Sequence, residues 1–257
     1  MGEKSQVNQR ATQSNGSRFF WNRSQLAYRE VTARYAIVLL VGRHLPQGIR
    51  PGQFVLVRYT EDPCLPRAFS VMSSSTEGIK LFVKTEGRVR EKFSTSPLGT
   101  EFDVRGPYGT AYEDKVSMDR EYVLVGGGSG AAPLLYFHAS YPDCVARTVY
   151  GFRTEDAQEL LPDTTLAIES LGGAKADVET EAVWRPGLGI IACGPEAMLR
   201  LLARRYRGQP DVYVSLESRI GCGIGTCLGC SIETSRGMQR ICREGPLFAL
   251  EELPWLN

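Results

Sequence analysis

The sequence has no long hydrophobic run and no marked excess of charge of either sign. No apolar stretch approaches the roughly 18 residues that a membrane-spanning helix needs, and the first residues lack the apolar core of a secretory signal. A formal net charge of +1 gives no electrostatic reason to expect binding to nucleic acid or to an anionic membrane surface. We therefore expect a cytoplasmic protein, in which cysteine thiols stay reduced and are free to bind a metal.

Histidine is nearly absent, because only His44 and His138 are present. Neither falls in a cluster of cysteines or acidic residues, so we expect both to be structural. The remaining composition, with 42% hydrophobic and 23% charged residues, is ordinary for a globular protein. A chain of 257 residues is long enough for two domains that each bury a core of their own.

Cysteine, by contrast, is concentrated near the end of the sequence. Four of the seven cysteines follow the spacing C-x4-C-x2-C with a more distant fourth, namely Cys222, Cys227, Cys230 and Cys242. This is the spacing of a plant-type [2Fe-2S] loop, in which four thiolates converge on two irons. Glycines lie between and beside these cysteines, and glycine permits the positive φ angles and close backbone approach that wrapping around a cluster requires. The stretch therefore predicts an iron–sulfur site.

Two other interpretations of the cysteines stay open. Structural zinc also binds four thiolates, but usually through two C-x2–4-C pairs, whereas the fourth cysteine stands alone here. A disulfide framework needs an oxidising compartment, for which nothing in the sequence argues. Cys64 and Cys144 lie outside the cluster, and we expect them to have no part in it.

The first half of the sequence divides into an extension and a β-rich segment. Residues 1–24 are polar and without periodicity, and we expect a mobile extension whose Phe19, Phe20 and Trp21 dock on a surface that the sequence does not identify. The next segment, 25–115, consists of short apolar runs separated by turn residues, which predicts an antiparallel β-barrel. Strands are expected at 54–57, 79–87 and 100–109.

The pattern changes at 116–212, where buried strands alternate with helical segments. Such alternation predicts an α/β domain with a doubly wound parallel sheet. Strands are expected at 121–125, 146–152, 164–170 and 188–194, and helices at 131–140 and 195–206. A last strand at 211–218 leads into the C-terminal segment 213–257, which carries the four cysteines.

Two turns follow strands of this sheet, at Gly126-Gly127-Gly128-Ser129-Gly130 and at Cys193-Gly194-Pro195-Glu196. A helix that begins at such a turn offers unpaired N–H groups and a positive dipole end, which suit a pyrophosphate. The first turn is a distorted G-x-G-x-x-G motif, and the next strand lacks the acidic residue of a standard ribose site. On these residues alone, a plain glycine turn and a small buried side chain at Cys193 stay open as structural interpretations.

Arg67-Ala68-Phe69-Ser70 lies between two expected strands of the barrel. An arginine can bind a phosphate through paired hydrogen bonds, while a serine hydroxyl reaches a flavin ring or a second oxygen. Taken in isolation, Arg67 is more simply a solvated surface charge.

In this order, the three stretches resemble the ferredoxin–NADP reductase superfamily and, within it, the electron-transfer subunits of type B dihydroorotate dehydrogenase. The resemblance covers about residues 27–250 and is most specific at Cys222–Cys242 and at Arg67–Ser70. It implies a barrel that binds FAD through Arg67–Ser70 and through Val83-Lys84-Thr85. It also implies that NAD(H) binds to the two turns of the sheet, in the groove between the domains.

One position departs from the family pattern. A Gly-Thr pair that meets the FAD pyrophosphate in the family is replaced here by Val89-Arg90. A valine keeps the backbone at a distance, and we expect Arg90 or Arg88 to replace the lost contact by charge. The departure leaves FAD or FMN open as the flavin.

The resemblance also implies a coenzyme and a partner. A single arginine, Arg153, flanked by Glu155 and Asp156, gives little support for a ribose phosphate, so NAD is expected rather than NADP. The implied partner is a catalytic FMN-containing dihydroorotate dehydrogenase subunit of pyrimidine biosynthesis, in a heterotetramer of two copies of each. Nicotinamide exchanges electron pairs and a cluster single electrons, and flavin exchanges both, so no catalytic acid or base is expected.

Two other functions stay open. A reductase subunit with the same cofactors could serve another partner, such as ferredoxin, sulfur or a hydrogenase. A zinc-stabilised binding module without redox activity would account for the departure at Val89-Arg90. Co-purification of a dihydroorotate-oxidising protein separates the first from the favoured function, and a visible spectrum separates the second.

Overall fold

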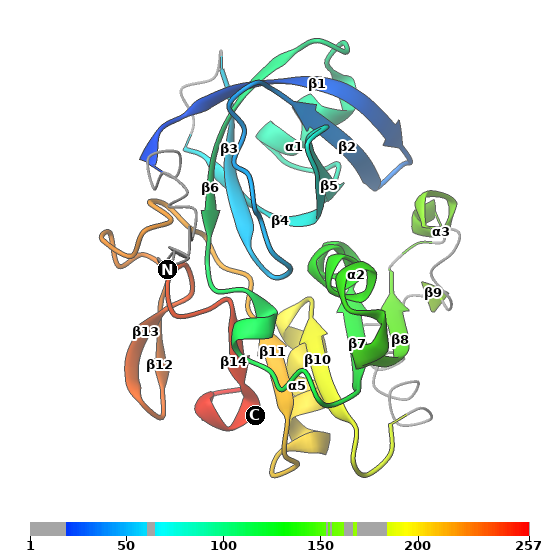
Figure 1. Ribbon diagram of the computed structural model, residues 1–257, viewed down its shortest axis with the longest axis vertical. Helices are drawn as coiled ribbons and strands as arrows, with labels where there is room; N and C mark the ends of the chain where they lie inside the picture. The colour runs from blue at the N-terminus through cyan, green and yellow to red at the C-terminus, as the bar shows by residue number, and fades with distance from the viewer. Residues whose placement is uncertain are drawn as a thin grey trace, which may run out of the picture.

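A computed structural model describes residues 19–60, 65–152, 154, 156–161, 167–168 and 184–256. Figure 1 shows a β-barrel at one end, a sheet with its helices at the other, and the C-terminal segment beside both. Cys64, Arg153 and Glu155 lie outside the described residues, as do residues 1–18 of the expected extension.

The first domain is a closed antiparallel barrel in the order β1-β2-β5-β4-β3-β6. Its strands are β1 (Asn22–Val31), β2 (Tyr35–Val41), β3 (Phe54–Tyr59), β4 (Arg67–Ser74), β5 (Ile79–Lys84) and β6 (Glu101–Tyr108). The barrel closes because β1 pairs with both β2 and β6. Val38, Val55 and Leu81 have no exposed surface and lie in its core. The barrel predicted from the sequence is confirmed.

A short helix, α1 (Arg88–Thr95), packs against the barrel and was not predicted from the sequence. Its buried residues Val89 and Phe93 belong to the barrel core. The rings of Phe93 and Phe102 lie 4.6 Å apart between centroids. The helix begins after Gly87, whose φ of +104° favours glycine.

The second domain is a sheet in the order β14-β11-β10-β7-β8-β9. Its strands are β7 (Tyr122–Gly127), β8 (Val145–Gly151), β9 (Ala167–Ile168), β10 (Gly189–Cys193), β11 (Val212–Ser215) and β14 (Leu247–Ala249). Strands β7 to β11 pair in parallel, and β14 pairs antiparallel with β11. The predicted doubly wound sheet is therefore confirmed, with an antiparallel edge strand added from the C-terminal segment.

Helices cover both faces of this sheet. The described helices are α2 (Ala131–Ser140), α3 (Asp156–Leu160) and α5 (Glu196–Tyr206), with 3-10 turns η2 (Tyr112–Asp114), η3 (Gly128–Gly130), η4 (Pro142–Cys144) and η5 (Leu250–Glu252). Leu134 of α2 shares a core with Leu124 of β7, whereas Leu199 of α5 shares a core with Val123 and Val125. Successive residues of β7 thus face opposite helices, as in a strand buried on both sides.

The C-terminal segment connects the two domains. It contains a hairpin of β12 (Ser231–Thr234) and β13 (Gly237–Arg240) before β14 joins the sheet. The backbone N–H of Thr110, which follows the barrel, donates to the carbonyl of Gly245 at 2.7 Å. Cys230 and Cys242 lie in the same hydrophobic core as Phe54 of the barrel. The cysteine loop is therefore fixed relative to both domains.

Element boundaries differ from the expectations mainly at the first strand. β1 begins at Asn22, inside the segment expected to be an extension. β9 is the described part of the strand expected at 164–170, and the rest of that range lies outside the described residues. None of the described helices is long and apolar enough to cross a membrane.

Candidate functional site

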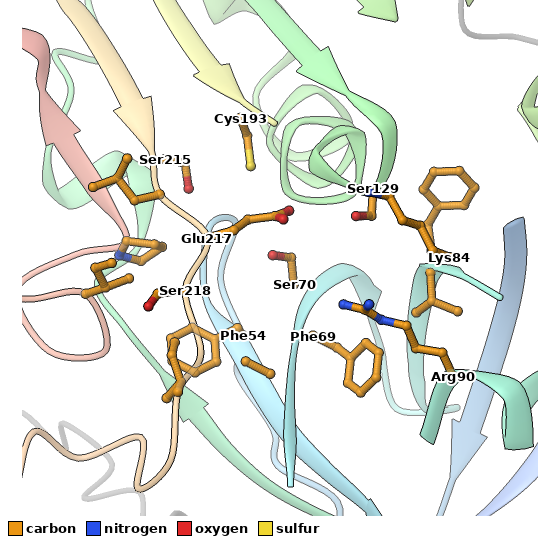
Figure 2. Close-up of a pocket in the computed structure, with 17 residues that line it drawn as sticks. Phe54, Phe69, Ser70, Lys84, Arg90, Ser129, Cys193, Ser215, Glu217 and Ser218 are labelled. Atoms are coloured by element: carbon orange, nitrogen blue, oxygen red, sulfur yellow. The ribbon is translucent and has the colours of Figure 1, made fainter. Parts of the chain in front are cut away.

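A pocket lies between the barrel and the carboxyl edge of the sheet (Figure 2). It contains about 700 Å³ of space outside protein atoms, including space open to solvent. Its lining residues are Phe54, Ala68, Phe69, Ser70, Phe82, Val83, Lys84, Arg90, Ser129, Cys193, Ser215, Leu216, Glu217, Ser218, Ile220, Ile241 and Pro246. These residues come from the barrel, the sheet and the C-terminal segment.

The barrel wall contains most of the residues expected to bind the flavin. Ala68, Phe69 and Ser70 of β4 and Val83 and Lys84 of β5 line the pocket. The two strands are neighbours in the barrel, so their residues reach the same space. Figure 2 shows the Ser70 side chain in the pocket, on the barrel side. An apolar wall with one hydroxyl and one ammonium group fits a ring system that carries a phosphate tail.

Arg90 reaches the same pocket from helix α1. Its guanidinium carbon lies 5.8 Å from the centroid of the Phe69 ring, and Figure 2 shows the group in the pocket near Ser70. The neighbouring Val89 is 3% exposed and packs in the barrel core. The valine side chain therefore does not stand between the pocket and the helix, and Arg90 adds a cation to the wall.

Besides Val89, two residues expected at the flavin lie outside the pocket lining. Arg67 is exposed, and its guanidinium donates to the carbonyl of Leu65 at 2.9 Å. The hydroxyl of Thr85 donates to the carbonyl of Ala33 at 3.1 Å, which joins the end of β5 to the β1–β2 turn. In this conformation both side chains stabilise loops of the barrel.

The two turns expected to bind a nucleotide pack against each other. They follow the neighbouring strands β7 and β10, where the winding of the sheet reverses and ligands commonly bind. A Cβ added at Gly130 would lie 2.3 Å from the carbonyl oxygen of Cys193. A Cβ at Gly127 would lie 2.6 Å from Cδ of Pro195, and one at Gly194 would lie 2.9 Å from Gly127. Glycine is therefore required here for contact between the turns themselves.

Of the residues in these two turns, Ser129 and Cys193 line the pocket. The others, Gly126, Gly127, Gly128, Gly130, Gly194, Pro195 and Glu196, form the turns behind it. Glu196 forms an ion pair with Arg200 on α5, with N and O 2.6 Å apart. Helices α2 and α5 begin at the turns, so both helix N-termini lie at the crevice.

Part of the wall was not predicted from the sequence. Ser215, the last residue of β11, and residues 216–218 and 220 after it line the pocket opposite the barrel. Figure 2 shows the Glu217 carboxylate extending into the space between Ser70 and Cys193. An acidic residue directly after a parallel strand, at the ligand-binding edge, is a signal that could have identified Glu217. Ile241 and Pro246 carry no such signal, because only the fold brings them here.

The surroundings of Glu217 change the pKa of its carboxyl group. Its surface is open to the pocket, yet protein surrounds the pocket on most sides. This burial raises the pKa of the Glu217 carboxyl above its usual value, and the charges of Lys84 and Arg90 act in the opposite direction.

We expect the substitution Glu217→Gln to stabilise the protein at neutral pH and to have little effect in acid. In the unfolded chain the Glu217 carboxyl has a pKa of about 4.5, and in the folded protein its pKa is higher. Below about pH 4.5 the carboxyl is protonated in both states, and its contribution to stability is fully present. That contribution is lost as the pH rises through the folded pKa, because the folded protein then holds a charged carboxylate in a buried site. Glutamine resembles the protonated carboxyl at every pH. The Tm difference between variant and parent should therefore increase between about pH 4 and about pH 8. Glu77→Gln, at an exposed turn, is the control, and a constant difference for Glu217→Gln would contradict the prediction.

Cys193 is a neutral thiol in this site. It is 1% exposed, and burial, followed by the nearby Glu217 charge, raises the pKa of its thiol, although hydrogen bonding to Ser215 and Tyr112 acts against this. A neutral thiol at the end of β10 offers a small, uncharged surface to a ligand. The site therefore gives no sign of a nucleophile or a general base at this position.

The four cysteines of the C-terminal loop form two pairs. The thiol of Cys222 is hydrogen-bonded to the backbone and side chain of Cys227. The backbone N–H of Cys242 points to Sγ of Cys230 at 3.5 Å. Burial, the Cys230 thiol and the charge of Cys222 together raise the pKa of Cys242 to about 12, so the two pairs lie near each other. None of the described cysteines forms a disulfide.

The loop fits an iron–sulfur cluster. Burial alone would raise the pKa of Cys222, but N–H groups of Cys227 and Ile224 and the side chain of Thr226 lower it to about 6, which favours the thiolate that a metal needs. Two adjacent pairs suit two irons better than a single zinc.

Comparisons with known proteins agree with this arrangement. The family model for the iron-sulfur cluster binding domain of dihydroorotate dehydrogenase B matches residues 217–254, which include the four cysteines. The electron transfer subunit of dihydroorotate dehydrogenase B (NAD(+)) from Clostridium acetobutylicum is 30% identical over 213 residues, covering 80% of this chain and 86% of the relative. The corresponding subunit from Bacillus cereus (strain Q1) is 30% identical over 247 residues, covering 88% and 95%.

Solved structures show the same fold. The structure of an NADH-dependent reduced ferredoxin-NADP oxidoreductase superposes with a TM-score of 0.75 at 23% identity and covers 90% of each chain. The ferredoxin reductase in carbazole 1,9a-dioxygenase superposes with a TM-score of 0.64 at 20% identity, covering 76% of this chain and 68% of the other. At these identities the likeness concerns the fold.

Proposed function

Because this chain belongs to the family of electron transfer subunits of dihydroorotate dehydrogenase B, we propose that it carries electrons between NAD(H) and a catalytic dihydroorotate dehydrogenase subunit. Its cofactors are FAD and a [2Fe-2S] cluster. The observation that carries the proposal is the wall of the pocket. Ser70 of the barrel, Ser129 and Cys193 of the sheet, and Ile241 and Pro246 of the cysteine segment border one space. A flavin there has the nucleotide turns on one side and the cluster segment on another.

We assign the flavin to the barrel side of this pocket. Phe69 and Val83 provide apolar surface, the Ser70 hydroxyl is a hydrogen-bond partner for the ring, and Lys84 and Arg90 are cations for the phosphates. The N-terminus of α1, where Val89 lies, adds the positive end of a helix dipole. Arg67 and Thr85 contribute if they leave the Leu65 and Ala33 carbonyls that they now contact.

We assign NAD(H), rather than NADP(H), to Gly126–Gly130 and Cys193–Glu196. The turns lie at the carboxyl edge of the sheet, and the helices that follow them direct N–H groups to the crevice. Ser129 and Cys193 face the flavin pocket, so a nicotinamide ring bound between them would lie beside the flavin. Close approach of this kind is what transfer of hydride requires.

We assign one iron to Cys222 and Cys227 and the other to Cys230 and Cys242, following the two pairs. Flavin, when bound, supplies the conversion between paired electrons from nicotinamide and single electrons for the cluster. The task of the protein is to hold these groups close together and to exclude solvent. Hydrogen bonds and burial at the cysteine loop set the affinity of the cluster for an electron.

The cysteine loop also presents a surface to a partner. Cys227 is exposed, and Leu228 beside it is 63% exposed. We propose that this tip contacts the catalytic subunit, which contains FMN. The two proteins form a heterotetramer with two copies of each, located in the cytoplasm. An exposed leucine next to a redox centre places apolar contact where electron transfer needs a short distance.

We expect Leu228→Asp to weaken the complex with the catalytic subunit by roughly fivefold or more, the effect of losing about 1 kcal/mol of apolar contact. Leu228 has a φ of +57°, a conformation that aspartate adopts more readily than leucine, so the loop should keep its shape. The measurement is the Kd for the catalytic subunit, with the cluster spectrum as a check. The control is Leu98→Asp, because the Leu98 side chain is 58% exposed and lies in the segment before β6. Equal Kd values for both variants would contradict the proposed surface.

The proposed function is tested by anaerobic purification together with a dihydroorotate-oxidising subunit, followed by a visible spectrum and by iron, zinc and flavin assays. We expect a yellow-brown complex with about two irons and about one flavin for each copy of this chain. A colourless protein that contains zinc would contradict the redox function. A coloured protein that does not bind the dihydroorotate-oxidising subunit would place it with another partner.

A further inference from the structure

One arginine of the barrel contacts the cysteine loop directly. Arg105 of β6 donates a hydrogen bond from Nη2 to the carbonyl oxygen of Cys222, with N and O 3.0 Å apart. Its guanidinium carbon lies 4.6 Å from the centroid of the Trp21 ring and 5.9 Å from that of Tyr108. Nε of Arg105 is buried and has no hydrogen-bond partner among the described residues. Two aromatic rings and one carbonyl therefore hold this cation in place.

Trp21 brings two cations together, but only one of them reaches the loop. The ring is half-buried directly before β1 and packs against the core that also contains Cys230 and Cys242. Arg58 lies over the same ring at 4.4 Å, and its Nε donates to Asp103 at 3.1 Å. Arg58 thus has a carboxylate partner within the barrel, whereas Arg105 has the carbonyl of Cys222.

The loop rests on the barrel at the next residue as well. Gly223 has a φ of +78°, and a Cβ there would lie 2.8 Å from the ring of Tyr108 and 3.1 Å from the side chain of Leu56. Both the first cysteine of the loop and the glycine after it are therefore pressed against β3 and β6. The barrel that lines the flavin pocket thus also sets the position of Cys222.

We propose that Arg105, held by the ring of Trp21, is a positioning residue for the cluster that fixes Cys222 on the barrel and raises the cluster's reduction potential. The inference rests on the proposed function, because it takes Cys222 as a cluster ligand. A [2Fe-2S] cluster gains one negative charge when it is reduced. A permanent cation hydrogen-bonded to a ligand residue stabilises the more negative state, and its half-buried location limits screening by solvent. Arg105 thereby favours movement of an electron from the flavin to the cluster.

Two substitutions at Arg105 separate the effect of its charge on the cluster from its effect on the position of Cys222. Arg105→Gln removes the charge and keeps an amide donor, whereas Arg105→Lys keeps the charge and loses the planar group. The test is an anaerobic redox titration of the loaded complex, followed by electron paramagnetic resonance of the cluster. For Arg105→Gln we expect the equilibrium constant for electron transfer from the flavin to the cluster to fall about tenfold. For a one-electron couple this is a decrease of ~59 mV in the reduction potential of the cluster. Arg105→Lys keeps the charge, so its cluster should keep most of the parent's reduction potential.

Arg58→Gln is the matched control, because it removes the same charge from the same ring without contacting Cys222. Its cluster potential should equal that of the parent. If Arg105→Gln loses its cluster, Trp21→Ala tests the same coupling by removing the ring that holds the Arg105 guanidinium, and we expect a lower cluster potential there too. An unchanged potential in the variants that retain the cluster, or an equal shift in Arg58→Gln, would overturn the inference. Absence of iron from the parent protein would instead overturn the proposed function, and metal analysis reveals this first.

Discussion

Replacing Cys227 with serine is expected to abolish the visible absorbance of the cluster and the reduction of the partner subunit, while transfer from NADH to the flavin continues. The thiolate of Cys227 is half of the pair that we assign to one iron, and a serine hydroxyl does not replace a thiolate ligand. Cys227 is exposed and does not line the flavin pocket, so the substitution leaves the core and the pocket intact. The measurements are the iron content, the visible spectrum, and the rates of flavin and partner reduction with NADH.

Cys144→Ser provides the control for this result. Cys144 is buried, and its thiol donates to the carbonyl of Met118 at 3.3 Å, which a serine hydroxyl can also do. This variant should keep its iron and all of its electron transfer. Loss of flavin reduction in well-folded Cys227→Ser would show that the order of carriers is wrong. A full iron content in Cys227→Ser would remove this residue from the ligand set.

The fold could be predicted from the sequence where local patterns repeat. Short runs separated by turns predicted the barrel, and buried strands alternating with helices predicted the sheet, because both patterns repeat locally along the sequence. Helix α1 has no such pattern. Only Val89 and Phe93 are buried, and the segment resembles a charged loop in composition. β14 is also short, and it enters the sheet only because the C-terminal segment returns to β11.

The site was predictable where one stretch supplies the chemistry. The cysteines are close in sequence, and so are the residues of β4 that line the pocket. Ile241 and Pro246 belong to the same wall but are brought there by tertiary structure, so their roles could not be derived from spacing, whereas the position of Glu217 after a parallel strand is a signal that could have been used. Trp21 shows the same limit, because its partner Arg105 is distant in the chain.

The glycines in the two turns of the sheet were expected to serve ligand binding, and the structure gives them a second role. Close backbone approach to a phosphate was the expected cause. Gly127, Gly130 and Gly194 are instead in contact with the opposite turn, so their lack of a side chain is needed before any ligand binds. The two causes act together, because turns that pack closely also keep the two helix N-termini at one crevice.

We expect Gly130→Ala to reduce NADH affinity by about tenfold. Gly130 has φ −64° and ψ −13°, which alanine adopts without strain, so the backbone conformation itself costs nothing. The new methyl group would lie 2.3 Å from the carbonyl oxygen of Cys193 and 2.5 Å from its carbon. Overpacking against backbone costs about 1–3 kcal/mol. If the two turns move apart to relieve this crowding, the site that both turns form for NADH is weakened. A loss of ~1.4 kcal/mol of binding free energy corresponds to a tenfold increase in the Kd for NADH.

Gly187→Ala separates crowding from backbone strain. Gly187 precedes β10 and has a φ of +101°, so alanine is strained there, but a Cβ at this position meets no atom within 4 Å. This variant should lose stability and keep its NADH affinity, whereas Gly130→Ala should lose NADH affinity and keep its flavin and cluster spectra. Titration of each oxidised protein with NADH under anaerobic conditions gives the affinities, and thermal unfolding gives the stabilities. An unchanged NADH affinity in Gly130→Ala would mean that NADH does not depend on the contact between the turns, and the nucleotide site would then lie elsewhere in the molecule.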